Sequence, residues 1–406
     1  MKFSPKLACA LLCTFLPSLT FAADQIEGAT PLQWSQRMAD SEMKRSDSKI
    51  QGKPGKGRWD YADSLFCHSL LNLGDVTKDP RYPDFTKRIF ATWVEPKGTI
   101  TSYKAALYSL DLIEPGRTAL ELYRRTKDQR YRKAADTLYA QLHDQPRTLK
   151  GGFWHKLRYQ HQMWLDGLYM GEPFYAQYAA TFKHPGDFED IAKQFALVTD
   201  HTANPRTGLL YHAWDESKSA VWADPATGRS PNYWSRSIGW YAMALVDVLD
   251  WMPASHPARP QLIAELNHVA AGILKYQDQD SGVWWQVTDQ GSRPGNYLES
   301  TSSSMFVYAL AKGVNHGYLP KSELPALRKG YAGIIHQFIQ KNRDGSISLT
   351  HCCKVASLDV KLTKKKRDGS FAYYTKGEPI VLNDHKGVGP FILAGLEMQK
   401  LPPDNR

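Results

Sequence analysis

Twelve segments of helical character alternate between two kinds along this chain, and this alternation restricts the fold more than any other feature of the sequence. Six of them place apolar residues at helical spacing among many charged or amide side chains, a pattern typical of outer helices. These amphipathic segments span residues 31–45, 81–93, 130–141, 187–200, 259–277 and 321–341. The other six are apolar or small almost all round, and they span residues 59–73, 113–124, 162–180, 233–252, 300–314 and 387–398. Because a helix that is apolar on every side must be buried, the alternation predicts two concentric rings of helices, an all-α toroid of helical pairs.

Four of the connections share a glycine turn followed by a short strand-like run. The glycines are Gly151, Gly208, Gly282 and Gly345, and each lies between an amphipathic segment and the next buried one. Such runs predict short β-hairpins around one mouth of the toroid. The spacing of the segments is too irregular for an open solenoid. No linker divides the chain, so we expect a single domain over residues 23–406.

The first 22 residues have the three parts of a secretory signal peptide. Lys2 and Lys6 supply the positive start, residues 7–16 are apolar, and residues 20–22 form a small-residue cleavage site. The apolar run is too short to span a bilayer, and no later stretch reaches about 18 apolar residues. We therefore expect a mature chain that begins near Ala23, lies in the periplasm or outside the cell, and does not bind a membrane.

The formal net charge of +10 at pH 7 indicates which class of molecule the protein binds. A basic balance suits a polyanion, and an exported protein meets acidic polysaccharide rather than nucleic acid. Part of the excess lies in one run, residues 361–367, which is typical of a solvated loop. An acidic saccharide is therefore the expected partner, and the sequence does not indicate an oligomeric state.

Three cysteines follow the predicted cleavage site: Cys67, Cys352 and Cys353. Neighbouring cysteines rarely bond to each other, because the geometry is strained. One bridge from Cys67 to Cys352 or Cys353 is an alternative, but three buried thiols is the expected state. No Cys/His cluster has the spacing of zinc ligands, and no phosphate-cradling loop or nucleophile elbow is present, so the residues indicate no metal site.

Two aspartates are the candidate catalytic groups. Asp166 lies early in an otherwise apolar segment, where a carboxylate is costly unless it is paired, hydrated or used. A helix cap or a buried hydrogen-bonded aspartate is the structural alternative for it. Asp111 comes shortly before the next buried segment, and its local sequence favours an N-cap, because aspartate before a helix with proline in its first turn is common.

Other polar and aromatic residues fall at corresponding places, near the N-terminal ends of buried segments. His155 and His212 end two hairpins, Trp59 opens the first buried segment, residues 300–304 open the fifth, and the fourth contains Trp234, Arg236 and Trp240. Helix N-termini favour anions, so this convergence predicts a pocket for an acidic sugar. The expected chemistry is general acid/base catalysis by one or two carboxylates, with mutual repulsion raising one pKa.

At these residues the sequence resembles the unsaturated rhamnogalacturonyl hydrolases of glycoside hydrolase family 105, which are related to the unsaturated glucuronyl hydrolases of family 88. The resemblance rests on residues 162–170, 210–217, 230–236, 304–313 and 386–391, and it covers nearly all of the mature chain in the same order. It implies an (α/α)6 barrel of six helical hairpins without metal or organic cofactor.

The resemblance also implies an uncommon reaction. The substrate carries a 4,5-unsaturated uronic acid at its non-reducing end, as a polysaccharide lyase leaves it, and the enzyme hydrates that double bond. Asp166 matches the acid/base that protonates C4 while water adds at C5, and the resulting hemiketal falls apart to release the uronic acid as a keto sugar acid. Asp111 matches the second active-site aspartate. Six residues match positions that line the pocket: Trp59, His155, His212, Trp234, Arg236 and Trp240. Among them, Arg236 is the expected partner of the uronate carboxylate, because a guanidinium pairs with it through two hydrogen bonds.

One region departs from the family pattern. Residues 351–358 carry less glycine than expected, and the basic run follows them, so the sugar next to the uronate is left open. Rhamnose, another neutral sugar and an aminosugar all remain alternatives. An inverting glycosidase that uses two carboxylates, or a polysaccharide lyase on the same barrel, is the first alternative function. A non-catalytic sugar-binding protein is the second, although such a protein could dispense with Asp166 and Asp111.

Overall fold

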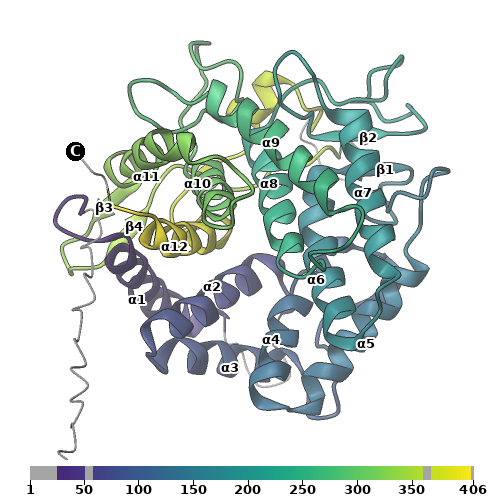
Figure 1. Ribbon diagram of the computed structural model, residues 1–406, viewed down its shortest axis with the longest axis horizontal. Helices are drawn as coiled ribbons and strands as arrows, with labels where there is room; N and C mark the ends of the chain where they lie inside the picture. Colours follow the sequence, from purple (N-terminus) through teal and green to yellow (C-terminus); the bar gives the residue numbers. More distant parts are fainter. Residues whose placement is uncertain (1–24, 51–57, 360–366, 404–406) are drawn as a thin grey trace, which may run out of the picture.

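The computed structural model describes residues 25–50, 58–359 and 367–403. The predicted signal peptide and residues 361–366 of the basic run lie outside this part of the chain. Six inner helices form a ring: α2 (Tyr61–Thr77), α4 (Gly116–Thr126), α6 (Leu165–Phe182), α8 (Ser235–Leu249), α10 (Ser300–Asn315) and α12 (His385–Lys400). Six outer helices surround it: α1 (Pro31–Ile50), α3 (Arg81–Trp93), α5 (Gln129–Asp144), α7 (Asp187–Thr202), α9 (Arg259–Lys275) and α11 (Leu324–Phe338). Figure 1 shows the two rings face on.

The inner ring is closed by contacts between neighbouring helices. Each inner helix packs against the next along the chain, and α12 packs against α2, so the last helix completes the circle. The outer helices stand behind them, with α3, α5, α7, α9 and α11 each packed on the preceding inner helix and α1 packed on α12. The predicted (α/α)6 barrel is confirmed, because every predicted amphipathic segment supplies an outer helix and every all-apolar segment supplies an inner one.

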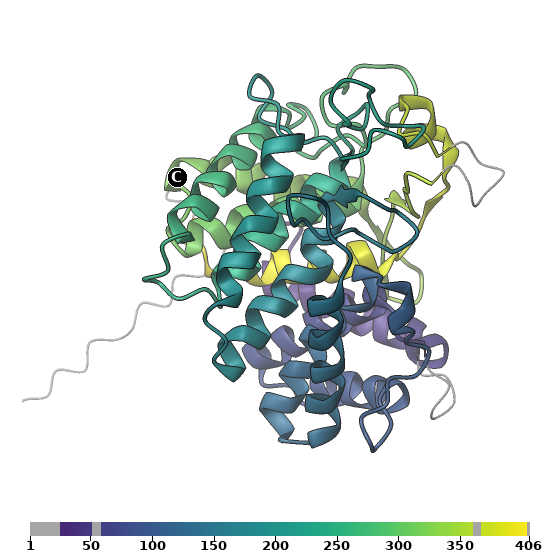
Figure 2. The ribbon, with the colours of Figure 1, turned by 90° about the vertical axis from the view of Figure 1, so that its right-hand side faces the viewer.

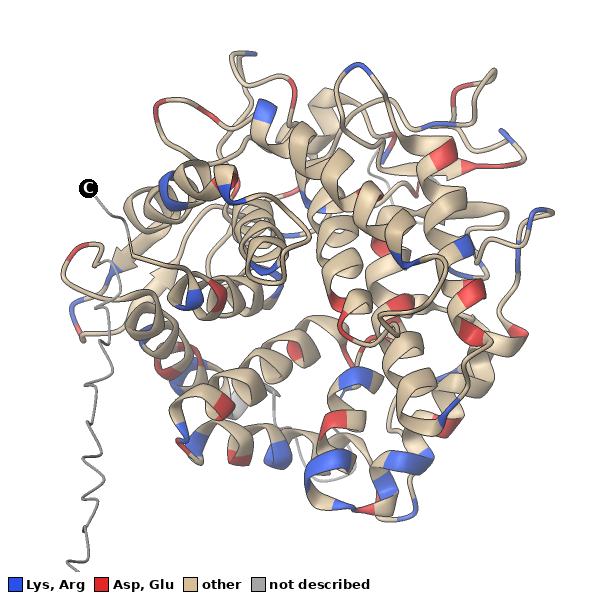
Figure 3. Ribbon diagram, viewed as in Figure 1, with Lys and Arg blue, Asp and Glu red and all other residues tan. Residues whose placement is uncertain are grey.

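Side-chain burial explains why the two kinds of segment separate. Every residue of α8 is buried, whereas α3 buries only one face, which consists of Tyr82, Phe85, Thr86, Ile89, Phe90 and Trp93. Lys, Arg, Asp and Glu are spread over the outer helices and the connections with both signs mixed (Figure 3). Figure 2 shows α12, in yellow, crossing the middle of the molecule, with the connection that precedes it at the right.

A charged network fixes the inner helices to one another inside the ring. The Arg117 guanidinium of α4 lies 2.9 Å from an Asp247 carboxylate oxygen of α8, and Lys312 Nζ of α10 lies 2.7 Å from the other oxygen. The hydroxyl of Tyr308 donates to Asp247 at 2.7 Å. Burial works to raise the pKa of Asp247, but Lys312 and Arg117 more than offset it and hold the pKa well below its usual range.

The connections form three short antiparallel strand pairs. These are β1 (Gln162–Trp164) with β2 (Ala213–Asp215), β3 (Ile339–Lys341) with β4 (Ile347–Leu349), and β5 (Cys352–Cys353) with β6 (Ile380–Val381). Of the four predicted hairpins, the one around Gly345 is a paired hairpin, β3–β4. The turns at Gly151 and Gly208 close single bridges, and the Gly282 turn is closed by a hydrogen bond from the Asp278 amide to the Val283 carbonyl.

Two predicted helix starts are wrong. Residues 162–164 form strand β1, and α6 begins at Leu165 because the backbone of these residues pairs with β2 instead. Trp59 does not open the first inner helix either: α2 begins at Tyr61, and Asp60 caps it by accepting hydrogen bonds from the amides of Ala62 and Asp63. The later start of α2 moves Trp59, a predicted site residue, from a helix into the connection before it, whereas Asp166 stays within α6.

The cysteines and the apolar helices are as expected. Cys67, Cys352 and Cys353 are buried free thiols, which excludes the alternative of a bridge from Cys67. Within the described residues, no helix combines the length and hydropathy that crossing a bilayer requires.

Candidate active site

Backbone hydrogen bonds join three neighbouring connections at one mouth of the barrel. The amide of Leu110 donates to the carbonyl of His155 at 3.1 Å, and the amide of His155 donates to Gln162 at 2.9 Å. The amide of Leu165 donates to the carbonyl of His212 at 3.1 Å, continuing the β1–β2 ladder in which Trp164 faces Ala213. These bonds bring the residues before α4, before α6 and before α8 together, so the predicted convergence of Asp111, His155, Asp166 and His212 is present in the structure.

Asp166 is held next to His212 without a structural hydrogen bond of its own. It is the second residue of α6, and its Oδ2 lies 3.2 Å from Nε2 of His212. Among the described residues, neither of these buried atoms has a partner with hydrogen-bond geometry. Trp164 occupies the cap position of α6, and Asp166 accepts no helix amide. The carboxylate therefore has neither of the two structural roles considered for it, and its side chain remains 13% exposed.

Tyr374 completes a chain of three side chains. Its hydroxyl lies 2.8 Å from Nδ1 of His212, and both residues are buried. A hydroxyl both donates and accepts, and a neutral imidazole carries its proton on one nitrogen only. When Tyr374 donates to Nδ1, the proton sits on Nε2 and faces an ionised Asp166. When Tyr374 accepts from Nδ1, the lone pair of Nε2 faces Asp166 and suits a protonated carboxyl. The chain thus accommodates both protonation states that an acid/base needs.

Asp111 has a different environment. It lies in the 3₁₀ turn Leu110–Leu112, and α4 begins only at Gly116, so Asp111 does not cap that helix. The Lys156 ammonium forms an ion pair with its Oδ2, and Nε2 of His155 lies 3.4 Å from its Oδ1. Burial works to raise the pKa of Asp111, but Lys156, His155 and Arg158 more than offset it, and the pKa lies below its usual value. Asp111 is therefore not the aspartate whose pKa is raised, because the neighbouring Lys156 ammonium favours its ionised form.

An aromatic stack links the two aspartates. The ring of Trp164 stacks on His155 at 4.7 Å and on Tyr159 at 4.6 Å between centroids, and it meets His212 edge-on at 5.3 Å. Burial lowers the pKa of His155 to about 4, so this imidazole is neutral near pH 7. Residues 351–358, where the sequence departs from the family, reach this stack: the hydroxyls of Ser357 and Tyr159 lie 3.3 Å apart.

Arg236 is more deeply buried than a substrate ligand at an open pocket, with 1% of its surface exposed. Its guanidinium lies over the ring of Trp234 at 4.8 Å, and Nη1 donates to the carbonyl of Cys353. Among the described residues its Nε has no hydrogen-bond partner, so the side chain keeps donor capacity. Trp234 in turn approaches His212 at 4.7 Å between ring centroids, which places Arg236 behind the Asp166 group.

Trp59 and Trp240 are also almost completely buried. Trp59 is 2% exposed and donates from its indole nitrogen to the carbonyl of Leu112 at 2.8 Å. Trp240 is 1% exposed and packs edge-on against Tyr61 at 6.3 Å. Tyr61 therefore stands between Trp240 and the pocket. Residues 300–304 are buried and do not line the pocket beside Asp111. The Ser303 and Ser304 hydroxyls bond to backbone carbonyls of their own helix turn.

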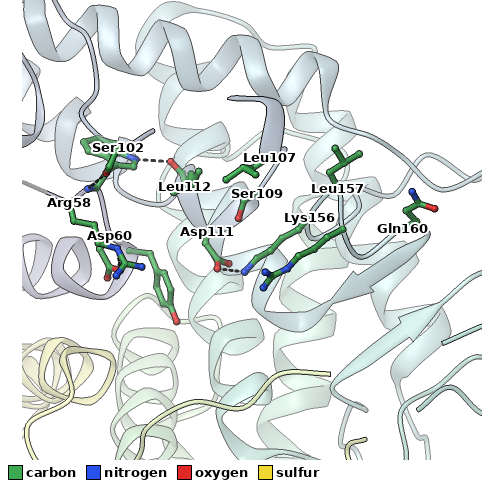
Figure 4. A pocket seen from close by; sticks show the side chains of 13 residues that line it. Arg58, Asp60, Ser102, Leu107, Ser109, Asp111, Leu112, Lys156, Leu157 and Gln160 are labelled. Atoms are coloured by element: carbon green, nitrogen blue, oxygen red, sulfur yellow. Dashed lines mark hydrogen bonds and ion pairs between the residues drawn. The ribbon is translucent and has the colours of Figure 1, made fainter. Parts of the chain in front are cut away.

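A pocket of about 680 Å³ opens beside Asp111. Its lining consists of Arg58, Trp59, Asp60, Tyr61, Ser102, Leu107, Ser109, Asp111, Leu112, Lys156, Leu157, Arg158 and Gln160. Figure 4 shows Arg58 and Asp60 on one side of it, and Lys156, Leu157 and Gln160 on the other. The volume is that of a site for a small organic ligand. The described residues contain no group of three or more His, Cys, Asp or Glu side chains that could hold a metal ion.

Sequence reasoning missed several residues of this site. Lys156 follows His155 directly and Tyr61 follows Trp59 by two positions, so adjacency to a predicted residue was an available signal for both. Tyr374 had no such signal, because it lies 162 positions from His212 in the sequence. Arg58 directly precedes Trp59, so the same signal was available for it, whereas Arg158 lay in a connection without periodicity, where nothing distinguished it from a solvated arginine.

Comparison with known proteins places the chain among carbohydrate-active enzymes. Residues 34–402 match the family model described as Glycosyl Hydrolase Family 88. The structure of a glycoside hydrolase of family 105 from C. acetobutylicum superimposes with a TM-score of 0.86 at 43% sequence identity, over 91% of this chain and 99% of that one. A protein of Agrobacterium fabrum is 38% identical over 232 residues, which is 56% of this chain and 97% of the relative. An unsaturated rhamnogalacturonyl hydrolase of Bacillus subtilis is 26% identical over 258 residues, 62% of this chain and 70% of the relative.

Proposed function

The chain belongs to glycoside hydrolase family 105, within the wider family 88 group of unsaturated uronyl hydrolases, and on this premise we propose that it acts on lyase-generated oligosaccharides from rhamnogalacturonan. Its substrate is an unsaturated galacturonyl residue linked to rhamnose. The relative from Bacillus subtilis supports this sugar pair by its name. The reaction adds water across the C4=C5 bond of the uronyl ring.

The observation that carries the proposal is the carboxyl group of Asp166, 3.2 Å from His212 and without a hydrogen-bond partner for Oδ2 among the described residues. Asp166 donates its proton to C4, and the developing positive charge at C5 is taken up by a water oxygen. The ionised carboxylate then accepts the proton which that water loses. The product is a hemiketal at C5, whose C5–O5 bond breaks to give a ketone at C5 and a hemiacetal at C1. The hemiacetal then collapses to an aldehyde, and its hydroxyl proton passes to the glycosidic oxygen as the bond from C1 to the neutral sugar breaks. The acid/base has returned to its starting state.

Asp111 serves a second role, because Lys156 lowers its pKa. A carboxylate that stays ionised can accept a hydrogen bond from a sugar hydroxyl or orient the attacking water, but it cannot act as the acid near neutral pH. Arg236 lies behind Trp234 and adds positive charge on the side where the uronate carboxylate would be bound. The two aspartates therefore divide the work: Asp166 transfers the proton and Asp111 orients.

The experiment compares unsaturated galacturonyl-rhamnose with its saturated counterpart. Loss of ultraviolet absorbance and release of free rhamnose are followed in parallel on the purified protein. Hydration of the double bond predicts that the absorbance falls in step with rhamnose release, and that the saturated disaccharide is not cleaved. Rhamnose release that runs ahead of the absorbance change, or cleavage of the saturated sugar, indicates attack at the anomeric carbon and refutes the proposal. A panel with glucuronyl and aminosugar disaccharides tests the identity of the neighbouring sugar.

A further inference from the structure

The pocket beside Asp111 carries more positive charge than the hydration of one uronyl ring uses. Three cations line it, Arg58, Lys156 and Arg158. Lys156 is already engaged, because it forms an ion pair with Asp111. The two arginines remain, and among the described residues neither has a carboxylate within hydrogen-bond distance.

Arg58 has only a weak partner. Its Nε lies 3.9 Å from Oδ2 of Asp60, which is beyond hydrogen-bond distance, and its side chain is 84% exposed. Asp60 is committed elsewhere, because its Oδ1 accepts hydrogen bonds from the amides of Ala62 and Asp63 at the start of α2. The guanidinium of Arg58 therefore faces the pocket with most of its five donors available.

Arg158 is pre-positioned without a carboxylate. Its guanidinium stacks on the ring of Tyr159 at 4.7 Å and donates to the Tyr159 hydroxyl at 2.8 Å. Within the described part of the chain it forms no ion pair, although its charge contributes to the lowered pKa of Asp111. Stacking fixes the plane of the guanidinium, which reduces the entropy lost when the group binds an anion.

Apolar side chains accompany these charges. Leu107 and Leu157 also line the pocket, and they are 52% and 39% exposed. Figure 4 shows them together with Ser109 on the wall above Asp111. Exposed leucines next to guanidinium groups that have no close carboxylate suit a ligand that is apolar on one face and anionic at one end, and an acidic oligosaccharide has this character.

We propose that Arg58 and Arg158 form a distal subsite for the carboxylate of a second uronate, two residues beyond the one that is hydrated. This inference rests on the proposed function, in which uronate and neutral sugar alternate along the substrate. With the first uronate between Asp166 and Asp111, the neutral sugar lies against Leu107 and Leu157, and the third residue brings its carboxylate to the arginines. The enzyme then prefers a tetrasaccharide to the disaccharide.

The test measures kcat/KM for the lyase-generated unsaturated disaccharide and tetrasaccharide on the full chain. Wild-type protein is expected to favour the tetrasaccharide. Arg58→Gln and Arg158→Gln should each lower the ratio of tetrasaccharide to disaccharide kcat/KM by about 1.5- to 5-fold, the usual worth of an exposed ionic contact. The preference should also shrink in high salt, because salt screens contacts of this kind. Arg206→Gln, an exposed arginine away from the pocket, is the matched control and should leave the ratio unchanged.

A change in the ligand separates charge from length. A tetrasaccharide whose third residue is a methyl ester keeps its size but loses the negative charge, so it should be turned over about as well as the disaccharide. Equal kcat/KM for both lengths in wild type, or equal losses on both substrates in the variants, overturns the distal subsite while leaving the proposed function intact. The second of these results would assign the arginines to the first uronate. If neither the disaccharide nor the tetrasaccharide reacts, the proposed function itself is refuted.

Discussion

The contact between Tyr374 and His212 predicts that the tyrosine hydroxyl positions His212 beside Asp166, and Tyr374→Phe tests this. The substitution removes one hydroxyl and keeps the ring, which stacks with Trp234 at 6.0 Å and 10° between planes. His212 Nδ1 then loses its partner at 2.8 Å. A neutral hydrogen bond of this kind is worth about 0.5–1.5 kcal/mol, which corresponds to a loss of roughly 2- to 12-fold in kcat/KM if the bond is felt in the transition state.

The hydroxyl of Tyr374 holds the His212 ring beside Asp166. Without it, Nδ1 of His212 loses its partner, and the ring keeps only its contacts with Trp164 and Trp234. Nε2 of His212 lies 3.2 Å from Asp166, so a ring that is held less well should slow proton transfer more than it weakens substrate binding. The loss should therefore appear in kcat.

Tyr373→Phe is the control for this variant. Tyr373 is the neighbouring residue, it is also buried, and its hydroxyl accepts a hydrogen bond from the Ser357 amide at 2.8 Å. Losing that bond should lower the free energy of unfolding by about 1–3 kcal/mol and leave kcat unchanged. Turnover is measured from the initial loss of ultraviolet absorbance, and stability from denaturant unfolding. If Tyr374→Phe turns over at the wild-type rate, the Tyr374 hydroxyl does not position His212 for catalysis.

Three further predictions concern the proton donor and the charges inside the barrel. Asp166→Asn keeps the size of the side chain but cannot cycle a proton, so turnover should fall by about 10²–10⁴ while the melting temperature stays near wild type; a stable, active variant would remove Asp166 from the mechanism. The pKa of His385 is raised to about 9, because carboxylates of α1 and α2 outweigh its burial, so its contribution to stability is present below about pH 6.5 and is lost as the pH rises through 9. Between pH 6 and pH 10, the free energy of unfolding should fall by about 3 kcal/mol more in wild type than in His385→Gln, and an equal fall would contradict the assignment. Lys312→Met leaves Asp247 short of one partner inside the ring and should destabilise by about 3–5 kcal/mol in denaturant unfolding, whereas a loss below about 1 kcal/mol would show that Arg117 suffices.

The two rings of helices could be predicted from the sequence, because the burial of a helix determines which of its positions are apolar. A helix that is covered on every side, such as α8, has no polar face at all, and its outer neighbour α9 does, so the two rings are separable without coordinates. The residues at which the helices begin were harder to predict from the sequence. At residues 162–164 an apolar run is compatible with a strand or a buried helix, and the pairing partner that decides between them lies 50 residues away in β2.

The candidate site was predictable only as a set of positions. Polar residues at the starts of inner helices converge because those starts share one mouth, and this holds for Asp166 and His212. Which residue balances which charge depends on contacts that the sequence does not display. Lys156 rather than Asp166 determines the pKa of Asp111, since the ammonium and not the second carboxylate touches it. Arg236 was identified by its motif, but its burial behind Trp234 is a result of packing alone.

The closure of the ring by α12 has a consequence for how the chain acquires its structure. This helix, which ends at Lys400, packs against α10, α2 and α1, so the first and last parts of the chain depend on each other. During synthesis the apolar flank of α2 stays uncovered until α12 has been made, and closure must bring together segments that are more than 300 residues apart. Until α12 emerges, the other inner helices therefore keep apolar surface exposed on either side of the gap. Removing α12 alone would leave an apolar gap between α10 and α2 that the other five pairs cannot cover.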